Sequence, residues 1–471
     1  MQKRTILYTL VALSIVAWQT VIPHTIQASS LSTTTLISNG VEGHGANDYV
    51  NPTGPGGTTD DGRFFVFSTS ASTIVAHDTN DMFDVFMYDR VTKKLELISH
   101  TALGLPADRS SYNPTISGDG RYIAYMSMAS NIVPGTAAFC ADAEICANIV
   151  VYDRQTKTTS FANQTATGKR IDNDLRTIGD NPPFISSNGR FVAYVSEAAI
   201  SSDDTNDNYD AFVYDRQTRQ TRAASITSSG KFDPHASTFD VSISGDGRMV
   251  AFSTWGHLVP EDTDYLYDDY VHDMQTGQTQ LVSITPTGKS GNSQSFEPVV
   301  SDNGKFVAFM SQASNLVARD TNGTYDIFLR NLQTNETSRI SMSTKGNQGN
   351  HHSFSPDISS DGRFVIFCSW ASNFVAHDDN DMGDVFLYDG FARTVRRVSR
   401  PSHDAGQATG GSLGTWQPVS ISGNGTTVTF TSDAKNLATP APTTDFPHLY
   451  SNYNPVVAIP FYDPTDYIDL L

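Results

Sequence analysis

The chain has few cysteines, no long apolar run beyond its first residues and a shortage of positive charge. Only 3 cysteines occur among 471 residues, too few for a scaffold built on disulfides. No stretch after residue 28 is long and apolar enough to span a membrane. Asp and Glu number 50 against 31 Lys and Arg, which gives a net charge of −19. This charge argues against nucleic acid and anionic membrane surfaces as partners, and it favours cations.

Familiar catalytic motifs are also missing. The sequence contains no Gly-x-Ser-x-Gly elbow, no His-Glu-x-x-His pair and no phosphate-binding glycine-rich loop. The spacing of His235, His351, His352 and His403 does not by itself predict a metal site, although they could assemble one. A catalytic pair of carboxylates cannot be picked out among 50 acidic residues. Enzymatic activity is therefore left open, and a non-enzymatic role is favoured.

The first residues have the pattern of a secretory signal peptide. Lys3 and Arg4 precede an apolar run at 6–17, and small residues follow from Ala28. The run is too short to cross a bilayer comfortably, and an uncleaved membrane anchor is the alternative. We assign residues 1–28 to a signal peptide and expect a secreted, periplasmic or cell-surface protein. Loss of its two basic residues changes the net charge from −19 to −21.

One phrase occurs seven times along the chain. Each copy reads approximately Asp/Asn-Gly-Arg/Lys-aromatic-Val-Ala-Phe-x-Ser. The glycines that mark the copies are Gly62, Gly120, Gly189, Gly247, Gly304, Gly362 and Gly425. Their separations run from 57 residues (247 to 304) to 69 residues (120 to 189). A regular period of this length indicates an array of one structural unit.

Each unit predicts four short strands. Examples are 114–117 for the first, 305–309 for the second, 84–88 for the third and 281–283 for the fourth. The Asp-Gly or Asn-Gly pair before the second strand tolerates the positive φ of a two-residue hairpin. No helical periodicity intervenes. We therefore predict an all-β fold over residues 31–450, a seven-bladed β-propeller with four antiparallel strands per blade. A parallel β-helix would need shorter and more uniform rungs.

The ring also needs a closing strand. The seventh unit shows strands at 417–422, 427–431 and 448–450 but no obvious fourth. Residues 35–38 resemble the fourth strands of other units and precede the first complete unit. We predict that this N-terminal strand completes the last blade. The alternative is that 456–459, in a C-terminal tail at 451–471, supplies it.

The repeated hairpin resembles the PD40 repeat of TolB-like, WD40-like propellers. The longer phrase from Ala313 to Phe328 is similar to a set of exported bacterial propeller proteins with Asp-x-Asn-x-x-x-Asp loops. The resemblance covers approximately residues 34–450 and implies the propeller fold. It says little about function, because members of the group serve as binding platforms, complex subunits and enzyme domains.

The loop between the second and third strands contains the only recurring chemistry. Five units place oxygen-bearing side chains at its first, third and seventh positions. These are Asp78, Asn80 and Asp84; Asp204, Asn206 and Asp210; Asp262, Asp264 and Asp268; Asp320, Asn322 and Asp326; and Asp378, Asn380 and Asp384. Such oxygens can converge on Ca²⁺. The alternative is that they only shape the turn. Because crowded acids repel one another, we predict structural calcium in these loops.

The two remaining units lack this pattern. The second has Cys140 and Cys146 at the same place, and a local disulfide between them would close the loop covalently. The seventh has prolines at 440 and 442, which stiffen the loop. Cys368 lies in an apolar run and is expected to be buried. The substitution of cysteine or proline for the acidic pattern favours a stabilising role for that pattern.

The segments that join consecutive blades share a face with the acidic loops. Their aromatic residues recur in register, which indicates packing between blades. Polar residues beside them vary from unit to unit, as a binding surface does: Arg109, Arg176, His235, Gln294 and His351. Ordinary solvated loops are the alternative. We expect a monomeric scaffold that binds a protein or glycan ligand on this face, with a polysaccharide-active hydrolase or lyase as the alternative.

Overall fold

The structure, a computed structural model, is all β. It describes residues 33–38, 46–51, 54–75, 78, 80–133, 147–164, 182–200, 203–376, 378–380, 382–401, 418–439, 441–442 and 446–453. The predicted signal peptide, the tail from residue 454, Arg176 and the Cys140–Cys146 pair lie outside these residues. Within the described ranges there is no helix, so none is long and apolar enough to cross a membrane.

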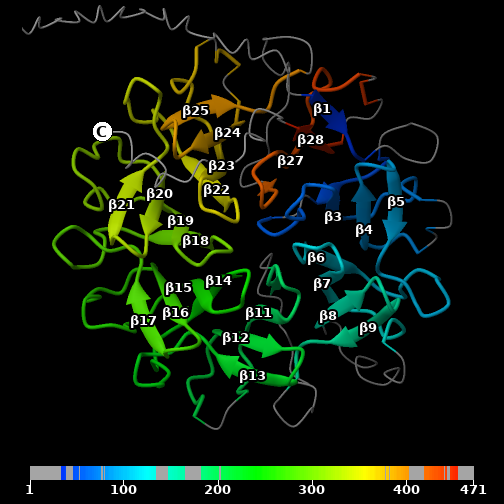
Figure 1. Ribbon diagram of the computed structural model, residues 1–471, viewed down its shortest axis with the longest axis horizontal. Helices are drawn as coiled ribbons and strands as arrows, with labels where there is room; N and C mark the ends of the chain where they lie inside the picture. The colour runs from blue at the N-terminus through cyan, green and yellow to red at the C-terminus, as the bar shows by residue number, and fades with distance from the viewer. Residues whose placement is uncertain are drawn as a thin grey trace, which may run out of the picture.

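Seven four-stranded antiparallel sheets form a ring (Figure 1), as the repeat predicts. The blades, from the inner to the outer strand, are β2(Val50–Asn51), β3(Phe64–Thr69), β4(Asp84–Asp89) and β5(Lys94–Leu97); β6(Ser111–Ile116), β7(Tyr122–Ser127), β8(Asn148–Asp153) and β9(Thr158–Phe161); β10(Phe184–Ile185), β11(Phe191–Ser196), β12(Asp210–Asp215) and β13(Gln220–Ala223); β14(Thr238–Ile243), β15(Met249–Thr254), β16(Asp268–Asp273) and β17(Gln278–Leu281); β18(Ser295–Val300), β19(Phe306–Ser311), β20(Asp326–Asn331) and β21(Glu336–Arg339); β22(Ser353–Ile358), β23(Phe364–Ser369), β24(Asp384–Asp389) and β25(Thr394–Arg397); and β26(Ser420–Ile421), β27(Thr427–Ser432), β28(His448–Tyr453) and β1(Thr33–Leu36).

The N-terminal strand closes the ring, which confirms that prediction. β1 pairs antiparallel with β28, with Thr33 opposite Tyr453 and Leu36 opposite Tyr450. The junction also uses a side chain, because Asn452 Nδ2 donates to Thr34 Oγ1 over 3.0 Å. The last blade is therefore assembled from both ends of the described chain, and Figure 1 shows β1 beside β28. The outer position that the alternative gave to 456–459 is filled by β1.

The Asp-Gly turns are longer than predicted. Residues 117–121 separate β6 from β7, where the sequence suggested a two-residue hairpin. The N–H of Gly120 donates to the carbonyl of Ser117 over 2.8 Å, which closes a four-residue turn. Gly120 has a φ of 71°, whereas Asp119 does not have a positive φ. Glycine at the last turn position is the pattern of a type I turn with a following bulge.

The same glycines allow consecutive blades to approach closely. A Cβ on Gly247 would lie 2.0 Å from Cδ2 of Phe191 in the preceding blade. A Cβ on Gly62 would lie 2.4 Å from Oγ1 of Thr427, across the closing junction of the ring. Because φ is also positive at both residues, a side chain is excluded there for two independent reasons. The repeated glycine thus fixes both the turn and the contact between blades.

The face that holds these turns is further braced by an arginine–aspartate pair in five blades. Each arginine follows the turn glycine, and each aspartate ends the third strand. The pairs are Arg63–Asp89, Arg121–Asp153, Arg190–Asp215, Arg248–Asp273 and Arg363–Asp389. In blade 3 both Arg190 Nε (2.9 Å) and Nη2 (2.6 Å) donate to Asp215. These bonds hold the pKa of Asp215 down at about 2.

The opposite face holds the acidic loops and the connections between blades. The alternation of strand direction places both on one side of the ring. The two are bonded to each other: the N–H of Ser295, at the start of blade 5, donates to the carbonyl of Tyr267 in the acidic loop of blade 4 over 2.8 Å. We call this side the loop face.

Candidate functional site: the acidic loops and the loop face

The last aspartate of each acidic loop is part of the sheet. These five residues begin β4, β12, β16, β20 and β24 and are at most 1 % exposed. Each accepts a hydrogen bond from a serine hydroxyl fifteen residues further on: Ser99, Ser225, Ser283, Ser341 and Ser399. The same serine oxygen accepts the backbone N–H that follows the aspartate. This aspartate therefore ties the third strand to the fourth in all five blades.

The middle asparagine of blades 1, 3 and 5 acts as a donor. Its Nδ2 lies 2.7 Å from Asp84 in blade 1, 3.2 Å from Asp210 in blade 3 and 2.8 Å from Asp326 in blade 5. Asn80 Oδ1 accepts the N–H of Met82, and Asn206 and Asn322 make the same bond two residues on. The amide oxygen is thus used by the backbone while the nitrogen faces the acid. This is the turn-shaping arrangement that the sequence left open.

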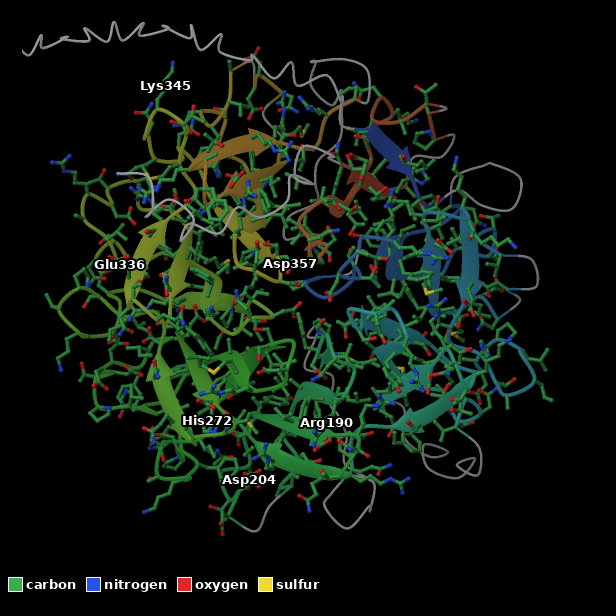
Figure 2. The ribbon with its side chains drawn as sticks, viewed as in Figure 1. Arg190, Asp204, His272, Glu336, Lys345 and Asp357 are labelled. Carbon is green, nitrogen blue, oxygen red and sulfur yellow. The ribbon has the colours of Figure 1, made fainter. Side chains whose placement is uncertain are left out.

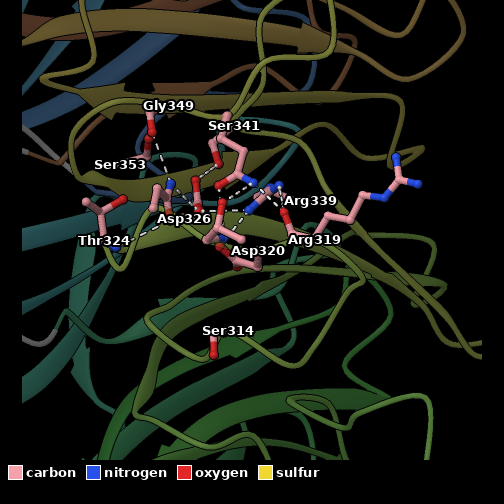
Figure 3. Close-up of polar contacts among 12 residues, drawn as sticks. Ser314, Arg319, Asp320, Thr324, Asp326, Arg339, Ser341, Gly349 and Ser353 are labelled. Atoms are coloured by element: carbon pink, nitrogen blue, oxygen red, sulfur yellow. Dashed lines mark hydrogen bonds and ion pairs between the residues drawn. The ribbon is translucent and has the colours of Figure 1, made fainter.

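A buried arginine balances the acids in blades 5 and 6. In blade 5, Arg339 Nη1 lies 2.7 Å from Asp320 and 3.4 Å from Asp326, as Figure 3 shows. The side chain of Arg339 is only 4 % exposed. In blade 6, Arg397 Nη1 lies 3.3 Å from Asp378 and 3.2 Å from Asp384. In both blades a guanidinium therefore bridges the first and last acids of the loop.

The corresponding residue is apolar in the other three blades. Arg339 and Arg397 both follow the last aspartate by thirteen residues. The same position holds Leu97 in blade 1, Ala223 in blade 3 and Leu281 in blade 4. None of these three can offset the charge of the acids. The five loops thus share one pattern but differ in their balance of charge.

Blade 4 differs again, because an aspartate replaces the middle asparagine. One oxygen atom from each of Asp262, Asp264 and Asp268 lies within 4.8 Å of the others. Within the described ranges, no other three acidic, histidine or cysteine side chains converge in this way. Asp264 Oδ1 accepts the N–H of Leu266 (3.0 Å), and its Oδ2 accepts the hydroxyl of Ser290 (3.0 Å). The carboxylate of Asp264, unlike the asparagine amide at this position in the other loops, has no N–H to donate to Asp268.

The missing donor has an electrostatic consequence. Asp268 is 0 % exposed, and its Oδ2 has no hydrogen-bond partner among the described residues. Burial, and to a smaller degree repulsion from Asp262 and Asp264, raises the pKa of Asp268 to about 8. In blade 5, where Asn322 and Arg339 both face the equivalent acid, burial raises the pKa of Asp326 only to about 6. The last acid of blade 4 is therefore less well compensated than the equivalent acid of blade 5.

The central opening of the ring is narrow and acidic. A cavity of about 50 Å³ there is lined by Asp60, Asp302 and Asp357, among other residues. Asp357, labelled near the centre of the ring in Figure 2, accepts the N–H of Ile421 over 2.8 Å. Burial raises its pKa to about 7. This cavity is therefore too small for a drug-sized ligand, and it is lined with acids that are costly to ionise.

Aromatic rings gather on the loop face of blades 4 to 6. In blade 4, the ring of Tyr267 contacts those of Phe239 (5.2 Å between centroids), Trp255 (5.6 Å) and Phe296 (5.2 Å). Trp255 is 44 % exposed although it packs on Tyr267. Because Phe239 and Phe296 begin neighbouring blades, these contacts bear out the predicted packing of recurring aromatics between blades. Trp255 adds an exposed ring on top of that packing.

A second cluster surrounds Trp370 in blade 6. Its ring contacts His351 (5.3 Å between centroids), His352 (6.3 Å) and Phe354 (5.4 Å). Trp370 follows β23 as Trp255 follows β15, so the two tryptophans occupy equivalent positions. The backbone N–H of each donates to a carbonyl in a connection between blades, that of Trp370 to His352 and that of Trp255 to Ser237. Both rings therefore lie where the second strand ends on the loop face.

The predicted ligand-binding residues lie on this face where the structure describes them. His351 is exposed and belongs to the Trp370 cluster, and His235 is exposed beside the connection into blade 4. Gln294 and Arg109 are half-buried, and the carbonyl of Gln294 accepts the N–H of Gln312 over 3.1 Å. The structure thus places His351 within an aromatic cluster. Neither the central cavity nor the larger cavity described next is lined by any of these four residues.

A larger cavity lies between blades 5 and 6, away from these clusters. It has a volume of about 510 Å³ and is lined in part by Tyr388, Phe391, Arg363 and Arg393. Arg363 stacks on Phe391, with its guanidinium carbon 4.5 Å from the ring centroid, and bonds to Asp389. This cavity offers a second, more cationic surface of a size that suits a small ligand.

Sequence reasoning missed the two arginines and the two exposed tryptophans. Alignment of the five units that have acidic loops would have shown Arg339 and Arg397 at one position, thirteen residues after the last aspartate. It would also have shown Trp255 and Trp370 directly after the second strand. Their roles depend on which strands are neighbours, and this follows from the register rather than from the local motif.

Comparisons with known proteins support the fold and nothing finer. No protein-family model matches the chain, and no curated protein matches it in sequence. Among solved structures, the oligogalacturonate lyase of Vibrio parahaemolyticus is similar over 90 % of this chain and 96 % of that protein, with 12 % identity and a TM-score of 0.51. TolB from Acinetobacter baumannii is similar over 71 % of this chain, with 14 % identity and a TM-score of 0.41, and the chain spans only 63 % of that TolB.

Proposed function

We propose that the protein is an exported β-propeller scaffold that binds a glycan or protein ligand on its loop face. The observation that supports this proposal is the aromatic surface of blades 4 to 6. Trp255 is 44 % exposed, and His351 is exposed beside the half-buried Trp370. Rigid amphipathic rings backed by other rings provide contact area at a low cost in side-chain entropy. Such rings suit both the apolar face of a sugar and an aromatic anchor of a protein.

The contrast between the two faces adds to this proposal. The turn face repeats the same glycine and the same arginine–aspartate pair in most blades. The loop face varies from blade to blade, as at Trp255, Gln312 and Trp370, which occupy equivalent positions. In repeat proteins, a surface that varies on a constant scaffold is the usual location of binding. Export rests on the sequence pattern of residues 1–28 alone.

Binding can be tested on a glycan array and by pull-down with tagged protein. We expect Trp255→Ala and Trp370→Ala to lose most of the binding, because hot spots concentrate in such rings. Arg393→Ala, in the cavity between blades 5 and 6, is the matched control and should retain binding. The proposal fails if the tryptophan variants bind as well as the wild type. Loss of binding in Arg393→Ala alone would indicate that the ligand binds in that cavity instead of on the loop face.

A polysaccharide-active lyase or hydrolase is the second candidate. One protein with a similar fold is an oligogalacturonate lyase, but 12 % identity supports the fold only. A reducing-sugar assay on the same glycans separates the two functions. Binding without product release supports the scaffold, and product release that requires residues of the loop face supports the enzyme.

A further inference from the structure

The five acidic loops allow an internal comparison, because the same backbone unit occurs with three different treatments of its charge. In blades 5 and 6 a guanidinium bridges the first and last acids. In blades 1 and 3 an asparagine nitrogen faces the last acid. Blade 4 has neither, and of the five loops it alone has a carboxylate at the middle position of the pattern. Of the five last acids, only that of blade 4 therefore receives neither an asparagine nor an arginine donor in the described residues.

We propose that the loop of blade 4 binds a single divalent cation, Ca²⁺, through Asp262, Asp264 and Asp268. Their oxygens converge within 4.8 Å of one another. This inference does not rest on the ligand-binding function proposed above. It reduces the number of loops expected to bind calcium from five to one.

A second observation points into the cluster, independently of its acidity. Asp268 is 0 % exposed, and its Oδ2 has no hydrogen-bond partner among the described residues. A buried carboxylate oxygen without a partner is strongly disfavoured in a folded protein. The equivalent oxygen in blade 5 receives both Asn322 and Arg339. A cation at the convergence of the three acids would complete the coordination that blade 5 obtains from its own side chains.

Arg339 and Arg397 show where positive charge is accepted in this loop. Each guanidinium lies against the first and last acids, which correspond to Asp262 and Asp268 in blade 4. Leu281 stands in place of the arginine and leaves that position without charge. The fold thus has a position for a cation at the centre of the loop. In blade 4 the fourth strand supplies no charged side chain at this position.

The donor atoms define the chemical class of the ion. All three side chains offer carboxylate oxygens, and hard oxygen ligands at several positions of a tight loop favour Ca²⁺ over softer transition metals. In blades 1 and 3 the middle residue presents an N–H to the last acid, and an N–H repels a cation. In blades 5 and 6 the arginine excludes it. The middle residue and the residue thirteen positions after the last acid therefore decide together whether an ion binds.

The test is a calorimetric titration with CaCl₂ of the full chain, stripped with EDTA that is then removed. We expect one ion per chain in the wild type and none in Asp264→Asn, which recreates the loop of blades 1, 3 and 5. Asn206→Asp builds the acidic trio in blade 3, beside the apolar Ala223, and should bind two ions. Asn322→Asp makes the same change in blade 5 beside Arg339 and should still bind one.

Controls separate binding from folding. Asp204→Asn removes an acid from blade 3 and should leave the single ion unchanged, and near-ultraviolet circular dichroism in EDTA should be the same for every variant. No bound ion in the wild type, or an ion retained in Asp264→Asn, overturns the proposal. Five bound ions in the wild type would show that Arg339 and Arg397 do not exclude calcium from blades 5 and 6. If Asp264→Asn does not fold, the wild-type count and the contrast between Asn206→Asp and Asn322→Asp decide the question.

Discussion

The acidic loops of blades 4 and 5 occupy equivalent places in the ring and end in the same buried aspartate, yet they compensate charge differently. Blade 5 has Asn322 and Arg339 facing Asp326. Blade 4 has Asp264 and Leu281 at those positions, and Asp268 Oδ2 accepts no hydrogen bond from the part of the chain that the structure describes. The difference indicates that the backbone of the loop does not depend on any one of these solutions.

The largest expected effect follows from removing the arginine of blade 5. Arg339→Leu leaves Asp320 and Asp326 buried without their bridging charge. Breaking a buried ion pair by removal of one partner costs about 3–5 kcal/mol. We expect a loss of this size in the free energy of unfolding, measured with urea in EDTA. A loss below about 1 kcal/mol would show that the arginine does not balance the acids, and the contrast with blade 4 would then have no energetic basis.

Acids elsewhere in the molecule extend the comparison to pH. Asp357 has no cationic partner among the described contacts, and burial raises its pKa to about 7; burial likewise raises the pKa of Glu297 to about 8. Because the folded state holds these protons more tightly than the unfolded chain, stability rises as the pH falls from about 8.5 to about 6, by about 4 kcal/mol for the two groups together. Melting curves over this range test it, and Asp357→Asn should flatten the rise.

The acids paired with arginine predict the opposite trend at lower pH. Arg190 holds the pKa of Asp215 at about 2, below its usual value, so this stabilisation is complete above pH 4. It is lost as the pH falls from about 4 to about 2. The full profile should therefore have a maximum between these two regions. A stability that increases steadily with pH up to 9 would contradict the raised pKa of the unpaired acids.

A smaller gain is expected when blade 4 is given the arginine of blade 5. Leu281→Arg places a guanidinium where Arg339 lies in the repeat. Since an unpartnered buried acid costs about 1–3 kcal/mol, we expect the free energy of unfolding in EDTA to rise by about 1–2 kcal/mol. CaCl₂ should no longer raise the melting temperature of this variant. A variant that is stabilised by calcium as strongly as the wild type would show that the guanidinium and the ion do not share one position.

The smallest effect is expected for an exposed pair of the same chemistry. The side chain of Arg190 is 41 % exposed where it bonds to Asp215, whereas that of Arg339 is 4 % exposed. Exposed ion pairs contribute about 0.2–1 kcal/mol. Arg190→Ala should therefore change the free energy of unfolding several-fold less than Arg339→Leu, and its effect should shrink further in 1 M NaCl. Equal losses in the two variants would mean that burial does not determine the strength of these pairs.

The fold was predictable because its signals are local and repeated. The turn glycines, the strand pattern after them and the strand expected at residues 35–38 can each be recognised from a few consecutive residues. The turn and strand signals occur in seven copies, which makes the repeat easy to detect. The turn itself was misjudged in length, since Asp119 and Gly120 occupy the end of a four-residue turn rather than the whole of a two-residue one. Sequence alone could not show this, because the same dipeptide occurs in both kinds of turn.

The charge balance of the loops was not predictable from the motif. Three acidic or amide side chains within seven residues suggested calcium in five loops, and this pattern is visible locally. Arg339 and Arg397 lie thirteen residues beyond it on another strand, and their contact with the acids depends on the pairing of the third and fourth strands. The orientation of Asn80, with its nitrogen toward Asp84, likewise depends on which backbone N–H its oxygen accepts. The contacts of the arginines and asparagines with the acids are therefore visible only in the assembled blade.

The most direct test of the account is a crystal structure with 10 mM CaCl₂, with data collected at a wavelength where calcium scatters anomalously. The account predicts one anomalous peak among the carboxylates of Asp262, Asp264 and Asp268. It predicts no peak beside Arg339 in blade 5 or Arg397 in blade 6. A peak beside either arginine, or none in blade 4, would contradict the conclusion that guanidinium and calcium occupy equivalent positions in this repeat.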